Sequence, residues 1–186
     1  MSSITLTAKH LTEEPVEQGI SWFIPSLSFI NFKDRKNIAT QEPLRSKVIT
    51  SYSTTNLYTS ATNQLIAKNF SANITGNILG IKVSIDSNRV GRITDKTIQL
   101  TYQNEPIGNN KAIVETVVNS YGLKEFTTGN NIQTYGSETD TWNASLTQEI
   151  VNDESFGIII QFASHPFYPH TDFVYIDSIS LEIFYE

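Results

Sequence analysis

Apolar and polar residues alternate with a period of two through most of the second half of the chain. The clearest case is the segment 76–86. Its Ile81, Val83 and Ile85 fall on one face of an extended segment, with polar residues between them. Because successive side chains of a β-strand point to opposite faces, the pattern predicts a strand with one buried face.

The same alternation recurs twice downstream. Residues 97–108 place Ile98, Leu100 and Tyr102 on one face and end in turn residues, and an apolar segment at 112–118 follows. These segments read as sequential antiparallel strands.

Two further strands are expected near the end of the chain, at 156–162 and 177–185. In the first, Ile159 is apolar on the face opposite the alternating set, which is typical of a central strand covered on both sides. The inward positions are Phe156, Ile158, Ile160 and Phe162 in the first segment, and Ile179, Leu181, Ile183 and Tyr185 in the second.

A short helical turn is expected at 145–152, with Thr147 as its N-terminal cap and Ile150 and Val151 facing inward. The whole pattern amounts to about eight to ten strands at a spacing of roughly 8 to 12 residues. We therefore predict an all-β fold, an antiparallel two-sheet sandwich that is jelly-roll-like, with one short helical turn.

Residues 1–45 differ from the rest, because their short apolar patches are interrupted by Pro15, Pro25 and Pro43. Proline confines strands to edges or loops, so this part is predicted to be an extended N-terminal arm, followed by the sandwich domain at 46–186. The arm could pack on its own domain or on a neighbouring subunit, and its cluster 33–36 is either a solvated turn or a binding patch. The candidate partner-contact residues are Trp22, Phe23, Phe29, Phe32, Lys33, Arg35 and Lys36 in the arm, and Phe167 and Tyr168 in a proline-rich loop.

Composition narrows the possible functions. The chain has 186 residues with 53 Ile, Val and Thr against 20 Ala, Leu and Met, which excludes a helical bundle. Its net charge of -6 with 13 Lys and Arg argues against general nucleic-acid binding. The longest charge-free stretch, 48–67, is too polar for a membrane span, and no secretory signal is visible.

Sequence motifs for catalysis are absent, including GxSxG, HExxH and the P-loop. His165, His170 and Asp172 could be imagined as metal ligands, but a loop gives them no fixed geometry, so we expect no metal and no cofactor. The neighbouring acids at 138 and 140, or at 153 and 154, are weak candidates for a glycosidase pair. We therefore predict that the chain is not an enzyme.

Four residues are expected to be structural. Trp142, beside Asp140, would plug one end of the sandwich, and its indole N–H would need an acceptor. Phe156 would begin a buried strand at a glycine that permits close packing. Asp177 is expected at a bulge in the last strand, bonded to backbone amides.

An ordered series of short segments between about residues 60 and 186 resembles a known module. The segments are GIKVSI at 80–85, DKTIQL at 95–100, IG at 107–108, KA at 111–112, YG at 135–136, DTW at 140–142, LT at 146–147, VN at 151–152, FGI at 156–158, IDSI at 176–179 and IFY at 183–185. In order and spacing they resemble a β-sandwich module of tailed-bacteriophage and prophage virion proteins, found in head-decoration, tail and fibre components. The N-terminal third and the insertion at 119–134 depart from that pattern.

The resemblance implies a non-enzymatic virion structural protein, above all a capsid cement or decoration subunit that binds the shell and neighbouring copies. The partners would be the major capsid protein or tail proteins, in a homo-oligomer for which a trimer is one candidate state. The location would be the virion, assembled in the bacterial cytoplasm. The alternative is a tail- or fibre-associated carbohydrate-binding module that stacks sugars on loop aromatics, for which Trp22, Tyr121, Tyr135, Trp142, Phe167 and Tyr168 are the candidates.

Overall fold

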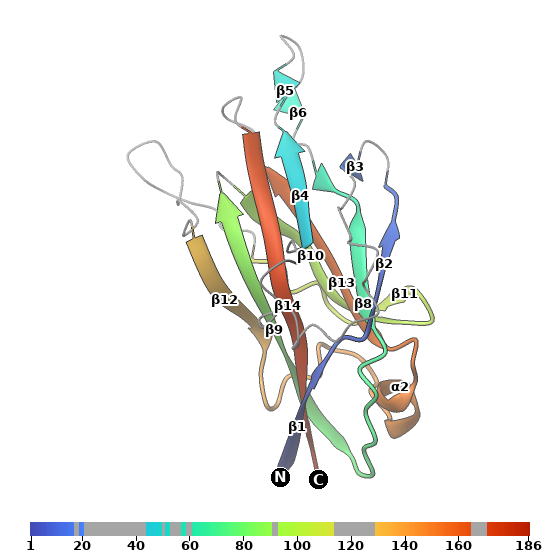
Figure 1. Ribbon diagram of the computed structural model, residues 1–186. Coiled ribbons are helices and arrows are strands. Elements are labelled where there is room, and N and C mark those ends of the chain that lie inside the picture. Colours follow the sequence, from blue (N-terminus) through green and yellow to red (C-terminus); the bar gives the residue numbers. More distant parts are fainter. Residues whose placement is uncertain are drawn as a thin grey trace.

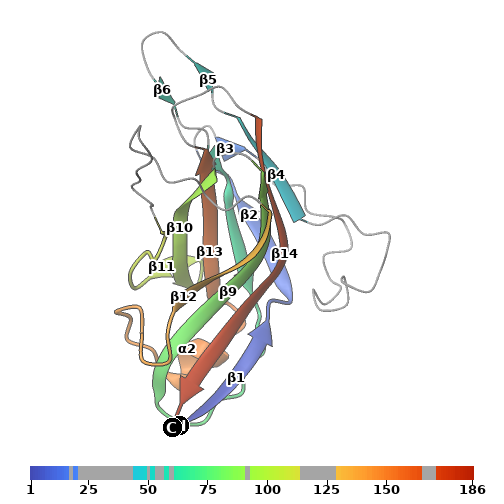
Figure 2. The same ribbon diagram turned by 90° about the vertical axis from the view of Figure 1, so that its left-hand side faces the viewer.

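Two β-sheets packed face to face form most of the described part of the protein (Figures 1 and 2). The computed structural model describes residues 1–16, 19–20, 44–49, 51–52, 57–58, 61–90, 93–113, 129–164 and 171–186. The prediction of an all-β, antiparallel two-sheet sandwich with a single short helical turn is confirmed within these residues.

The first sheet, sheet A, is built around its longest strand, β14. The strand order is β1-β14-β9-β12, and β4 also pairs with β14. β1 pairs with residues 180–185 of β14 and β4 with residues 171–176, so these two strands follow one another along the same side of β14. The bounds are β1 (Ser2–Thr7), β4 (Leu44–Ile49), β9 (Ile78–Val90), β12 (Gly129–Gly136) and β14 (Thr171–Tyr185).

The second sheet, sheet B, is centred on β13, which pairs with β10 on one side and with β7 and β8 on the other. β11 lies beyond β10, β2 pairs with β8, and the short β3 runs parallel to β7. The bounds are β2 (His10–Glu14), β3 (Gly19–Ile20), β7 (Ala61–Thr62), β8 (Gln64–Lys68), β10 (Ile93–Tyr102), β11 (Glu105–Ile107) and β13 (Gly157–Ser164). A separate two-stranded ribbon is formed by β5 (Ser51–Tyr52) and β6 (Leu57–Tyr58).

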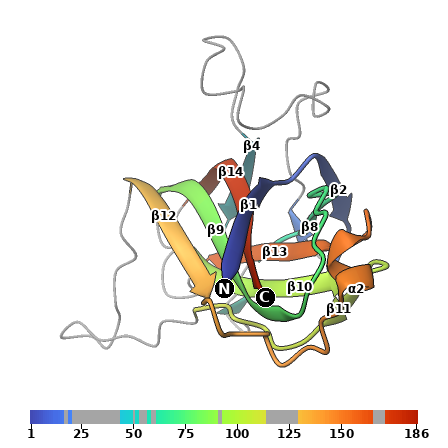
Figure 3. The same ribbon diagram turned by 90° about the horizontal axis from the view of Figure 1, so that it is seen from below.

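The connections are those of a jelly roll. From β8 onward the chain passes to the opposite sheet at each step except the β10–β11 hairpin, so that β8, β10, β11 and β13 lie in sheet B and β9, β12 and β14 in sheet A (Figure 3). Residue range 76–86 forms part of β9, and 97–108 covers the end of β10 and the whole of β11, which pair with each other as an antiparallel hairpin. β9 and β10 lie in opposite sheets, and each also pairs with a strand distant in sequence.

The first residues of the predicted arm pack on the chain's own sandwich, which is one of the two placements that the sequence left open. At Ala8 and Lys9 the chain passes from sheet A to sheet B, where the Ala8 N–H donates to Ile179 O at 3.3 Å and the Lys9 N–H to Lys68 O at 3.3 Å. Residues 2–14 of the predicted arm form β1 and β2, which pair with β14 and β8 of the same chain, and Pro15 follows β2. Residues 21–43 lie outside the described residues.

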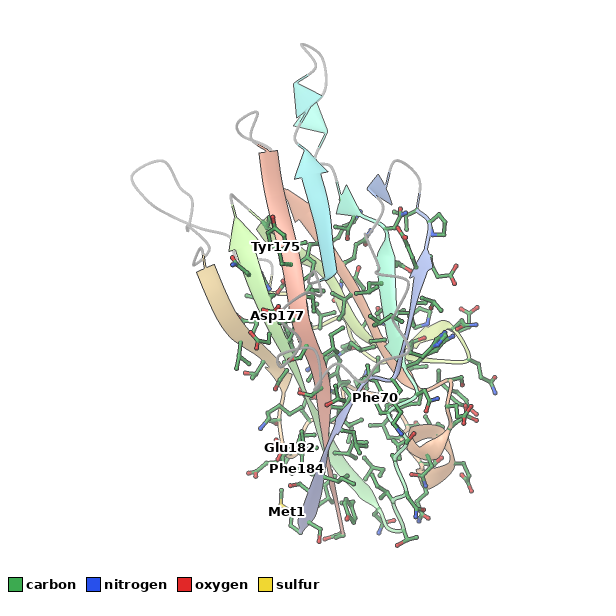
Figure 4. The ribbon with its side chains drawn as sticks, in the orientation of Figure 1. Met1, Phe70, Tyr175, Asp177, Glu182 and Phe184 are labelled. Atoms are coloured by element: carbon green, nitrogen blue, oxygen red, sulfur yellow. The ribbon has the colours of Figure 1, made fainter. Side chains whose placement is uncertain are left out.

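The core lies between the two sheets, where the alternating apolar rows meet. The predicted inward residues of the two late strands are buried, apart from a half-buried Tyr185. Ile159 is buried as well, on the opposite face of the central strand β13. The register of β14 shifts between Ile176 and Ser178, which places the predicted bulge at Asp177; Figure 4 shows this residue on β14.

The helical turn forms where it was predicted, as α2 (Gln148–Asn152). The Thr147 hydroxyl accepts from the Ile150 N–H at 3.3 Å, and Val151 is buried against the core. The Asn152 side chain then accepts from the Ile74 N–H and donates to Ile74 O, both at 2.9 Å. This two-way pairing holds the helix against the loop that precedes β9.

Candidate functional site

Charged side chains meet inside the sandwich and link its two sheets. Arg89 on β9 and Asp95 on β10 are only 5% and 2% exposed, and the Arg89 Nη2 atom lies 3.0 Å from Asp95 Oδ1. The Tyr135 hydroxyl from β12 donates to Asp95 Oδ2 at 2.8 Å, and the guanidinium stands 4.8 Å from the ring centroid of Phe162. Sheet A thus contributes the arginine and the tyrosine, and sheet B contributes the carboxylate and the phenyl ring.

This cluster acts as a cross-brace between the sheets. Burial raises the pKa of Tyr135 far above its ordinary value, and the adjacent Asp95 carboxylate raises it further, while Arg89 opposes them. The phenol therefore remains a protonated donor at any physiological pH. The ion pair between Arg89 and Asp95 and the hydrogen bond from Tyr135 to Asp95 thus connect the two sheets.

Trp142 plugs one end of the sandwich. Its side chain is fully buried, and its indole N–H finds the expected acceptor in Ile81 O at 2.8 Å. Trp142 and Asn143 both have a left-handed backbone, with φ of 60° and 55°, and the Ala144 N–H donates to Thr141 O at 3.0 Å across this turn. A bulky residue at positive φ is uncommon, so the burial of the indole compensates for local strain.

Asp140 stabilises the loop that carries Trp142. Its Oδ1 accepts from the Trp142 N–H at 2.8 Å, its Oδ2 lies 2.8 Å from Lys111 Nζ, and its carbonyl accepts from the Ile81 N–H at 3.0 Å. Partial burial opposes ionisation, but the hydrogen bonds from Lys111 and from the Trp142 N–H together hold the pKa of Asp140 below its usual value. The indole of Trp142 packs closely against Gly136 (φ +76°), which has no side chain. A Cβ atom at this position would lie 2.6 Å from the indole nitrogen.

The other two predicted structural residues also lie at packing positions. Phe156 is buried immediately before β13. At the neighbouring Gly157 a Cβ would come within 2.1 Å of Ala67 O on β8, so only glycine fits this close pairing. Asp177 is half-buried at the bulge.

The candidate binding site is a polar pocket of about 320 Å³ on the side of sheet B, where β2 and β8 approach the loop after α2. The Asn69 N–H donates to Glu154 O at 3.0 Å and so joins the two walls. Lys68 Nζ donates to Asn104 Oδ1 at 3.0 Å at its side. The lining residues are His10, Lys68, Asn69, Glu154 and Ser155.

The turns around this pocket have fixed conformations. Asn69 has a left-handed backbone (φ 57°), and so do Gln103 and Asn104 at the centre of the β10–β11 hairpin. Ser155 donates through its hydroxyl at 2.6 Å and its N–H at 2.8 Å to Asp153 Oδ1. These two bonds lower the pKa of Asp153, so the carboxylate stays ionised and holds the serine in place.

An ammonium, an imidazole, an amide, a hydroxyl and a carboxylate around one small pocket offer both donors and acceptors, which suits a hydroxyl-rich ligand. Within the described ranges there is no group of three or more His, Asp or Glu residues placed to hold a metal ion. Sequence reasoning missed this pocket, because His10 meets Lys68 only through pairing of strands that are distant in sequence.

The predicted contact residues lie outside the described residues: Trp22, Phe23, Phe29, Phe32, Lys33, Arg35, Lys36, Phe167 and Tyr168. Tyr121 of the proposed sugar platforms also lies outside them. The proposal that Tyr135 and Trp142 are sugar platforms is wrong, because both rings are buried in the core.

Comparison with protein-family models, with curated protein sequences and with solved structures found no match. No helix among the described residues has the length and apolar character needed to cross a membrane.

Proposed function

We propose that the chain is a non-enzymatic structural protein of a tailed-bacteriophage particle, a capsid cement or decoration subunit that binds the shell and neighbouring copies. The observation that carries this proposal is the jelly-roll order of strands β8 to β14. Viral capsid domains use this architecture, although they share it with lectins and cupins. Because a fold alone does not define a function, further support has to come from particular residues.

That support comes from the segments on which the resemblance depends. The segments at 80–85 in β9 and 135–136 in β12 meet the loop segment 140–142, where the Ile81 carbonyl accepts from the Trp142 indole N–H and the Ile81 N–H donates to the Asp140 carbonyl. The interior charges of Arg89 and Asp95 are used in the brace between the sheets. Both features favour a rigid body suited to repeated contacts in a symmetric particle.

Cosedimentation tests the proposal. The purified chain would be mixed separately with purified capsids and purified tails of the phage or prophage whose genome encodes it. We expect saturable binding to capsids and none to tails, and an increase in the temperature at which capsids release DNA. Binding to tails alone would reject the cement role, and binding to neither would reject the virion role.

The polar pocket favours a second candidate function, a carbohydrate-binding module of a tail or fibre. Its lining residues supply donors and acceptors for sugar hydroxyls. The chain would be titrated calorimetrically with soluble bacterial surface polysaccharide, alongside Lys68→Ala and the control Lys96→Ala, whose lysine is exposed on β10 away from the pocket. Binding that Lys68→Ala weakens about tenfold and Lys96→Ala leaves unchanged would support this function.

A further inference from the structure

We propose that β12 is a self-association edge, along which a second copy of this chain adds its own β12 and continues sheet A. The inference rests on the proposed assembly function and names the contact through which copies meet. Among the described strands β12 pairs only with β9, and it forms one end of the strand order of sheet A (Figure 3). An edge strand presents backbone N–H and C=O groups that can pair with another strand.

β12 lacks the charged residues and proline that usually prevent an edge strand from pairing with another chain. Its sequence, GNNIQTYG, contains no charged residue and no proline. The edge strand of sheet B is different, because β11 has the sequence EPI, with an exposed Glu105 and an exposed Pro106. The outermost described strand beside β8, β2, carries Glu13 and Glu14. Charges and proline block edge-to-edge addition, so β11 and β2 are protected. Among the described strands, the two ends of sheet A, β12 and β1 (SSITLT), carry neither device, and of these two β12 carries a strongly exposed isoleucine.

The exposure of the Ile132 side chain also supports β12 as the contact strand. At 61% exposure, it is the large hydrophobic residue most exposed within the described strands. It sits in the middle of β12, opposite Asp86 of β9. Exposure of one isoleucine is ordinary, but here it lies on an unprotected edge strand.

A second copy fits this edge in a defined register. Residues opposite one another in an antiparallel pair lie on the same face of the sheet. A two-fold axis through position 132 therefore pairs Ile132 with Ile132 of the other copy, and positions 129–135 of each strand with one another in reverse order. The two exposed isoleucines then cover each other, and the contact is isologous and closed.

Charge on the strand itself does not oppose a second copy at β12. The chain carries a net charge of -6, so two copies repel each other in general, but β12 itself is uncharged. A single-strand edge buries less than the roughly 1,200 Å² of a standard stable interface. We therefore expect weak association in solution that becomes effective when a particle holds many copies together.

Disulfide trapping tests the register. The natural chain has no cysteine, so a single Ile132→Cys substitution gives one thiol, and mild oxidation should yield a covalent dimer on a non-reducing gel. The matched control is Glu105→Cys, an exposed position on the protected edge strand β11. We expect Ile132→Cys to cross-link at least tenfold faster than Glu105→Cys. Equal cross-linking rates for the two variants would overturn the inference. Such rates are expected if the copies meet by random collision, or if β12 pairs with a strand other than β12 of the second copy.

A second variant tests the association without new thiols. Ile132→Lys puts a charge on the exposed face of β12 and should fold normally, as checked by its circular dichroism and unfolding midpoint. We expect sedimentation equilibrium to show concentration-dependent dimerisation for the natural chain and its loss in Ile132→Lys. A natural chain that is monomeric at every concentration tested and on capsids would overturn the inference. Because capsid binding is measured separately, that result would leave the proposed cement function standing.

Discussion

The guanidinium of Arg89 and the carboxylate of Asp95 meet at 3.0 Å between the two sheets, and both residues are buried. Removing one partner leaves the other charge buried. We expect Asp95→Ala to lower the free energy of unfolding by about 3–5 kcal/mol, measured by urea denaturation.

The matched control is the double variant Arg89→Met with Asp95→Leu, which replaces the pair by apolar side chains. It should lie closer in stability to the natural chain than Asp95→Ala does, because no charge remains uncompensated. If the single and double variants lose the same stability, the brace is not held by its charges.

Trp142 holds the loop 137–147 against Ile81. We expect Trp142→Ala to cost about 3–5 kcal/mol of unfolding free energy, because it empties the end of the core. Trp142→Phe keeps an aromatic ring and loses the indole hydrogen bond, so it should cost about 1–3 kcal/mol. Hydrogen exchange should show faster exchange at 137–147 in both variants, and an unchanged loop would contradict its anchoring by the indole.

The contact of Asp140 with Lys111 predicts a pH dependence. The pKa of Asp140 is lowered in the folded state relative to its unfolded value of about 3.9. The contact therefore contributes stability that is fully present above pH of about 5 and is lost as the pH falls through the lowered folded pKa. The unfolding midpoint of Asp140→Asn should lie below that of the natural chain at neutral pH, and the difference between the two midpoints should narrow progressively as the pH falls below about 4. A gap that stays constant from pH 7 to 2 would exclude this origin.

Deletion of β1 and β2 should strongly destabilise the fold. β1 pairs with β14 and β2 with β8, so deletion of residues 1–14 exposes one edge in each sheet. We expect the deleted chain to lose cooperative thermal unfolding or to aggregate. A synthetic peptide of residues 1–14 added in trans should restore part of the transition, whereas a peptide of the same composition in scrambled order should not. A truncated chain as stable as the natural one would contradict the described pairing.

Several features could be predicted because they depend on neighbouring residues. The alternation around Val83 and Ile160 predicts buried strand faces, since the period of two is a property of the extended backbone. Thr147 marks the start of α2 through its own side chain. Asp177 marks the bulge because a short acidic residue breaks an otherwise regular strand.

Other features depend on distant parts of the chain. The sequence did not decide where the start of the arm packs, because the partners of β1 and β2 are β14 and β8, which lie far along the chain. The polar pocket was not foreseen, since β2 and β8 bring His10 and Lys68 opposite one another across a long stretch of sequence. From the sequence, Tyr135 was expected to be an exposed aromatic residue near a loop. In the structure its hydroxyl donates a hydrogen bond to the Asp95 carboxylate inside the core.

The sequence by itself determined that this protein is built of strands, which faces of those strands are apolar, and where the short helix begins. These properties follow from backbone geometry and side-chain character within a few residues. Only the tertiary structure decided which strands pair, that β9 and β10 lie in opposite sheets, and that Arg89 meets Asp95 between them. Pairing depends on the burial of all the apolar faces at once, and many alternative pairings are compatible with the same local alternation.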